Sequence, residues 1–107
     1  MKVLAILIAA AVAPSVPTVE VCARLDPELI HCPQPVAPRI TELWGGKVTL
    51  AIEVNPDGSV HSSRVLSSSG HPAWVEPTQI AVTKWRYSAS KERRVRVVPF
   101  DFQLGDP

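Results

Sequence analysis

The residues with the clearest capacity for chemistry are the two cysteines, Cys22 and Cys32, which lie close together in the sequence. In an oxidising compartment such a pair forms a disulfide and closes a short loop, which stabilises the folded state modestly. His31, next to Cys32, raises the alternative of a metal site. Adjacent side chains point in different directions and no fourth ligand lies nearby, so we favour the disulfide and predict no metal and no cofactor.

A second cluster that could do chemistry is the serine run at residues 67–69, followed by His71. A catalytic serine needs a positioned base and an oxyanion hole, whereas a Ser-Ser-Ser-Gly run is typical of a turn. The carboxylates Glu53 and Asp57 are predicted on a strand face and in a turn. A pair of carboxylates that acts as general acid and base needs a pocket, which a small three-stranded sheet hardly provides. We therefore predict that the chain is not an enzyme.

The composition is that of an ordinary globular protein. The chain has 107 residues, enough for one small domain, and 46% of them are apolar and 20% charged. Its net charge of +1 lacks the basic excess of a nucleic-acid-binding face, so we predict no nucleic-acid partner.

The amino terminus has the features of a secretory signal peptide. A charged start at Lys2 precedes an apolar run at residues 3–13, which is too short to span a bilayer that needs about 20 apolar residues. We therefore predict export, with the signal within residues 1–23 and no membrane-spanning helix. Small residues leave two cleavage positions open, after Ala13 or after Ala23. The second would remove Cys22 and leave the remaining cysteine free to pair between chains.

A hairpin is the element around which the rest of the chain is organised. In residues 47–54 apolar side chains alternate with more polar ones, a period of two that predicts a strand with one buried face. Residues 55–58, Asn-Pro-Asp-Gly, predict a turn into a second strand at residues 59–66. A two-stranded ribbon is marginal in water, so later segments must supply a third strand and a cover.

The helices are predicted on either side of this hairpin. Residues 14–37 are rich in proline and form a lead-in that we interpret as a linker or extended strap rather than core. Apolar spacing predicts a short helix at residues 38–44. A longer cover helix is predicted from residue 76 to residue 84 or 85, with Pro77 at its first position and Trp85 as a core anchor.

The third strand is predicted at residues 95–104, which alternate again between apolar and polar side chains. Pro99 lacks an N–H group and is confined to an edge or a bulge, so one side of this strand has no ladder partner. The predicted fold is α+β, a three-stranded antiparallel sheet with a short N-terminal helix and one longer helix packed on one face. An extended peptide could add to the unpaired side.

Five segments in order resemble the carboxy-terminal domain of the TonB family. They are Gly46-Lys47-Val48, Asn55-Pro56-Asp57-Gly58-Ser59-Val60, Val65-Leu66-Ser67-Ser68-Ser69-Gly70, Ala81-Val82-Thr83-Lys84-Trp85-Arg86-Tyr87 and Val98-Pro99-Phe100-Asp101-Phe102-Gln103-Leu104. The most specific is Lys84-Trp85-Arg86-Tyr87. The resemblance covers residues 33–104, and we assign residues 38–104 to this domain. The family fold agrees with the fold predicted from periodicity.

The resemblance implies a periplasmic, non-catalytic module that pairs its last strand with an extended segment of an outer-membrane receptor or another envelope protein. The candidate partner-binding residues on that strand are Arg94, Arg96, Val97, Pro99, Asp101 and Gln103. A full energy transducer has a spanning helix and a long spacer, so this chain resembles a free-standing short form. The alternative is an accessory envelope protein that keeps the fold without receptor coupling, for example as a strand-exchanged homodimer.

Overall fold

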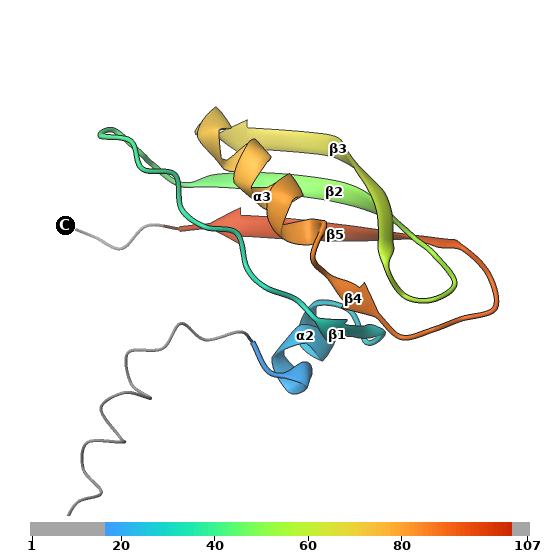
Figure 1. Cartoon of the computed structure of the whole chain (residues 1–107). Coiled ribbons are helices and arrows are strands. Elements are labelled where there is room, and N and C mark those ends of the chain that lie inside the picture. Colours follow the sequence, from blue (N-terminus) through green and yellow to red (C-terminus); the bar gives the residue numbers. More distant parts are fainter. Residues whose placement is uncertain (1–16, 104–107) are drawn as a thin grey trace, which may run out of the picture.

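The computed structural model describes residues 17–103 and is built on one antiparallel sheet. The strands β2 (Gly46–Val54), β3 (Val60–Gly70) and β5 (Arg94–Phe102) lie in the order β3-β2-β5 (Figure 1). The predicted α+β fold and the three-stranded sheet are confirmed. Leu104, at the end of the predicted third strand, lies outside the described residues.

The hairpin between β2 and β3 turns where the sequence predicts it. Gly58 has a φ of +95°, a conformation that favours glycine, and its N–H donates to the Asn55 carbonyl over 2.9 Å. The Asp57 carboxylate accepts from the Ser59 hydroxyl and N–H, which lowers the pKa of Asp57. The predicted turn at residues 67–69 is wrong. These serines lie in β3, because the ladder with β2 extends to the pair Gly46↔Gly70 and outweighs the local turn preference.

A single helix covers one face of the sheet. The helix α3 (Val75–Val82) follows the short 3₁₀ helix η1 (Pro72–Trp74), and Pro77 lies in its first turn, where a missing N–H costs no helical bond. The predicted cover helix is thus present, although it begins one residue earlier and ends at Val82. The buried side chains between the helix, the sheet and the segment after the helix include Val48, Leu50, Ile52, Val54, Thr78, Ala81, Val82, Trp85, Val98 and Phe100.

The short helix that precedes the sheet is α2 (Val19–Leu25), capped by the Thr18 side chain. The helix predicted at residues 38–44 is wrong, since this segment holds only a turn at residues 41–42. A helix as short as this segment is marginal in isolation and needs tertiary packing of its apolar face, whereas Ile40 and Trp44 are exposed. At the end of the segment, the Trp44 carbonyl accepts from the Trp74 indole over 2.8 Å.

The lead-in contributes to the core, contrary to its interpretation as a strap. We call residues 19–32 the amino-terminal module; it comprises α2, β1 (Leu29–His31) and the disulfide that joins Cys22 to Cys32. Both cysteines and Leu29 are fully buried. The strand β1 pairs with the short strand β4 (Arg86–Tyr87) in a second small sheet. Hydrophobic burial and a ladder therefore hold this proline-rich segment against the domain.

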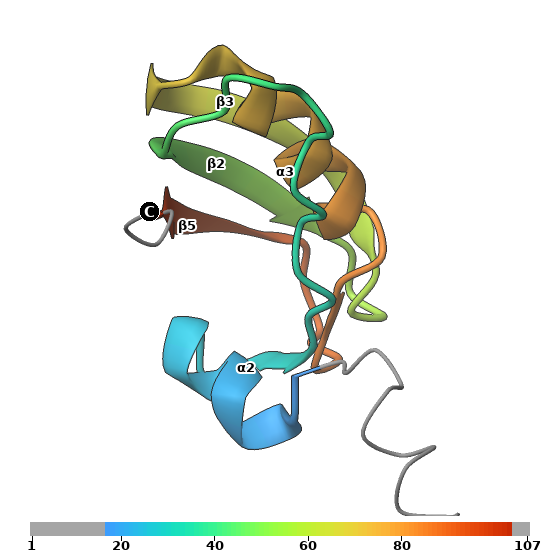
Figure 2. The same ribbon diagram turned by 90° about the vertical axis from the view of Figure 1, so that its left-hand side faces the viewer.

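The module lies beside β5 on the side away from β2, as the two views show (Figures 1 and 2). Just after the module, the Pro33 carbonyl accepts from the Trp85 indole over 2.8 Å, which links it to the core. Between residues 17 and 103 no helix is long and apolar enough to cross a membrane. The predicted apolar run of the signal peptide and the cleavage position after Ala13 lie outside the described residues.

Candidate functional site

The strand β5 forms one edge of the sheet. Among the described residues it pairs with β2 alone, and its register runs without a bulge from Val54↔Arg94 to Gly46↔Phe102. Pro99 lies opposite Thr49 in the middle of this ladder. An edge is the place where a strand tolerates proline. The chain therefore presents a regular extended backbone whose outer side pairs with no described strand, and the amino-terminal module lies beside that side.

The side chains of β5 alternate between the two faces of the sheet. Val98 and Phe100 are buried under α3, whereas Val95 and Val97 are 61% and 58% exposed on the opposite face. Pro99 and Asp101 continue this exposed row. The apolar side chains of Val95 and Val97 are therefore exposed to solvent along the outer edge of β5.

The direction of the backbone groups follows from the contacts of Gly45. Gly45, the residue before β2, accepts a hydrogen bond from the His71 N–H over 3.1 Å and so directs its backbone groups toward β3. The next residue, Gly46, then directs its backbone groups toward β5, where it lies opposite Phe102, and the Phe102 carbonyl oxygen lies close to Gly45. In an antiparallel pair a residue directs both its N–H and its C=O to the same side, and successive residues alternate. Even-numbered residues of β5 therefore face β2, and the outward residues are Val95, Val97, Pro99 and Asp101.

The outward groups have no backbone partner in the described chain. Among residues 17–103, β5 pairs with β2 alone, and no turn, loop or cap hydrogen bond between backbone atoms involves Val95, Val97 or Asp101. Pro99 contributes a carbonyl but no N–H, and because it faces outward it removes no bond from the ladder with β2. The edge therefore offers four acceptors and three donors to an incoming strand.

The first half of β5 is held by the amino-terminal module. The Arg96 guanidinium binds both carboxylate oxygens of the buried Asp26, over 2.7 and 2.8 Å, and this hydrogen bonding raises the pKa of Arg96. Arg94 lies 2.9 Å from the Glu28 carboxylate, and it also donates to the Ser88 carbonyl. These side chains are engaged within the molecule and lie on the helix-covered face.

The six sequence-predicted partner residues thus fall into two groups. The side chains of Arg94 and Arg96 are bound to the module, whereas Val97, Pro99 and Asp101 are exposed along the rest of the strand and Gln103 is exposed just after it. The Gln103 amide lies 3.4 Å from the Asp101 carboxylate. Sequence reasoning missed Asp26 and Glu28, because they lie in the proline-rich lead-in and Asp26 is 70 positions from its partner.

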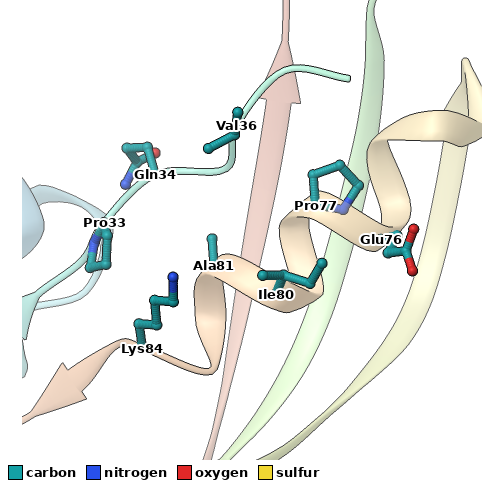
Figure 3. A pocket seen from close by; sticks show the side chains of 8 residues that line it. All are labelled: Pro33, Gln34, Val36, Glu76, Pro77, Ile80, Ala81 and Lys84. Atoms are coloured by element: carbon teal, nitrogen blue, oxygen red, sulfur yellow. The ribbon is translucent and has the colours of Figure 1, made fainter. Parts of the chain in front are cut away.

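An apolar groove of about 360 Å³ lies away from this edge, between residues 33–36 and α3 (Figure 3). Figure 3 shows Val36 pointing toward α3, with Ala81 and Ile80 on the facing helix. The charged side chains that line it, Glu76 and Lys84, are two helical turns apart. Among the described residues, no serine, cysteine or histidine lines the groove.

A helix-covered sheet that ends in a regular edge strand is a scaffold to which an extended peptide can add. The chain belongs to the TonB C-terminal family, since the family model described as Gram-negative bacterial TonB protein C-terminal matches residues 41–104. A comparison with curated proteins gives no match. The chain is therefore a TonB-like envelope domain of a non-catalytic interaction family. The amino-terminal module lies before the matched residues.

Proposed function

We propose that this domain is a periplasmic binding module that adds an extended segment of an outer-membrane receptor, or of another envelope protein, to the open edge of β5. The observation that carries the proposal is the row of outward N–H and C=O groups at Val95, Val97 and Asp101, which have no backbone partner among residues 17–103. In strand addition, backbone bonds give affinity and alternate side chains give selection. Family membership supports the same role.

The binding residues take different parts in this proposal. Val97, Pro99 and Asp101, along the exposed part of the strand, and Gln103, just after it, contact the partner directly. Arg94 and Arg96 act indirectly, since Glu28 and Asp26 hold their side chains and so fix the start of the strand. A fixed strand lowers the entropy lost when a partner adds to it.

Export is part of the proposal. The disulfide is typical of a protein that folds in an oxidising compartment such as the periplasm. Cys22 lies in α2 and pairs with Cys32, so we propose that the signal peptide is cleaved after Ala13 rather than after Ala23. Mass spectrometry of the secreted chain tests this directly, because the two products differ by ten residues.

The test of partner binding is an NMR titration of the secreted chain with synthetic peptides taken from the amino-terminal extended segments of outer-membrane receptors. We expect the backbone amide signals of Val95, Val97 and Asp101 to shift first and most strongly. The signals of β3, at the other edge, should move little. Peptides that shift β3 instead, or that shift neither edge, contradict the proposal.

A matched pair of prolines localises the binding. Val97→Pro removes one outward donor from β5 and should weaken peptide binding by about five- to tenfold, the effect of one lost hydrogen bond. Ser68→Pro places the same residue at an outward position of β3, where Ser68 lies opposite Val48. It should leave peptide binding unchanged. Equal losses in the two variants would show that the peptide does not use the β5 edge.

A further inference from the structure

Apart from the amino-terminal module that lies beside it, the outer edge of β5 carries few of the features that prevent strands from pairing with copies of themselves (Figures 1 and 2). Such edges are usually interrupted by bulges, charged side chains or proline. The register of β5 has no bulge, Val95 and Val97 are exposed beside it, and the charge of Arg96 is bound by Asp26. Pro99 is the one interruption in the middle of the strand.

We propose that Pro99 keeps this edge closed to a second copy of the chain while leaving it open to a different polypeptide. A two-fold interface uses every residue twice. In an antiparallel pair of two β5 strands in which Val98 lies opposite Val98 of the other copy, Val97 of each copy lies opposite Pro99 of the other. Each of these two pairs lacks the hydrogen bond that an N–H group at position 99 would donate, so the dimer lacks two hydrogen bonds. A foreign strand meets Pro99 once and loses one bond. The missing N–H therefore penalises self-pairing twice as strongly as partner binding.

The proposal concerns the edge to which partner binding is assigned above, and in that sense it rests on the proposed function. It can be tested without any partner. The measurement is sedimentation equilibrium of the oxidised, secreted chain over a range of concentrations. The wild-type chain should remain monomeric, and Pro99→Ala should dimerise about ten- to a hundredfold more tightly, as expected for two restored hydrogen bonds.

The control separates the N–H group from the shape of the proline ring. A chain with N-methylalanine at position 99, made by chemical ligation, has the alanine side chain but no N–H, and it should behave like the wild type. If it dimerises as tightly as Pro99→Ala, or if the wild type does so, the proposal is overturned. Pro99→Val also carries the N–H and provides a second test should the alanine variant not fold, as judged by near-ultraviolet circular dichroism.

The outcome separates this proposal from the proposed function. Receptor peptides that bind the wild type while Pro99→Ala stays monomeric would overturn the role of Pro99 alone. The opposite result is a dimeric alanine variant and a wild type that binds none of the peptides. It would support the role of Pro99 and contradict the proposed binding of receptor segments.

Discussion

The two edges of the sheet, β3 and β5, differ in side chains and in the regularity of their backbones. The register of β3 against β2 shifts twice, between Thr49 and Leu50 and between Glu53 and Val54. Half of its exposed residues are serines, and Leu66 is its one exposed large apolar side chain. The register of β5 against the same central strand has no shift, and Val95 and Val97 are exposed beside it.

This difference shows how one central strand can support a closed edge and an open one. A bulge leaves an extra residue unpaired and increases the local twist, so β3 is a poor template for another strand. The regular β5 is a good template, and the ion pairs Arg96–Asp26 and Arg94–Glu28 hold it in place. The edge strand with the regular backbone, β5, is therefore also the one whose side chains are bound by the amino-terminal module.

The largest loss of stability is expected from Trp85→Ala, because Trp85 lies in the core that supports both edge strands. Trp85 is fully buried, packs on Phe100 with ring centres 5.5 Å apart and donates to the Pro33 carbonyl. Its loss should cost about 3–5 kcal/mol of unfolding free energy, a large part of the roughly 5–15 typical of a domain. Urea unfolding of the variant measures it.

The control for this variant is Trp44→Ala, because Trp44 is 54% exposed and should cost less than about 1 kcal/mol. If the two tryptophan variants lose the same stability, the assignment of Trp85 as the core anchor is wrong. Hydrogen exchange should rise at both β3 and β5 in the Trp85 variant, since the core below both edges is lost.

A smaller effect that distinguishes the edges is expected when the disulfide is removed by the double change Cys22→Ser and Cys32→Ser. Opening this short loop should cost about 2–3 kcal/mol. Because the module contacts β5 through Asp26 and Glu28, hydrogen exchange should increase in β5 and β4 more than in β3. Equal increases at both edges would show that the module does not steady β5 selectively. Reductant added to the double variant is the control and should have no effect.

The elements that local patterns define were predictable from the sequence. The alternation of residues 47–54 indicates β2, and the turn at Gly58 follows from residues whose backbone preferences are strong in isolation. Pro99 predicts an edge position for β5 because its missing N–H is a covalent property. The cysteine pair was expected from its compartment and spacing, and the structure contains that disulfide.

The features that depend on distant partners were not predictable. The serines at residues 67–69 form strand because β2 offers them a ladder, and residues 38–44 are irregular although their apolar spacing is helical. Asp26 gives no local sign that Arg96 will bind it. Such contacts are set by the tertiary fold, which overrides weak local propensity.

The smallest expected effect is a dependence of stability on alkaline pH that arises on the β5 side of the molecule. Tyr87, the only tyrosine, is buried in β4 opposite Leu29 of the module, and this burial raises its pKa above the usual value of 10.0. A tyrosine with a raised pKa in the folded state stabilises the protein fully below pH 10. This contribution is lost as the pH rises further, because the unfolded chain releases the proton first.

Tyr87→Phe should remove this part of the alkaline loss. At pH 7 it should change the stability by less than about 1 kcal/mol, since the hydroxyl has no hydrogen-bond partner among the described residues. Urea unfolding at pH 7 and at pH 11 measures both effects, and ultraviolet absorbance of the wild-type chain follows the ionisation of this single tyrosine. A variant that loses as much stability at pH 11 as the wild type would assign the alkaline loss to the lysines instead. In that case the ionisation of Tyr87 would contribute nothing to the loss of unfolding free energy at alkaline pH, and the alkaline effect would not arise on the β5 side of the sheet.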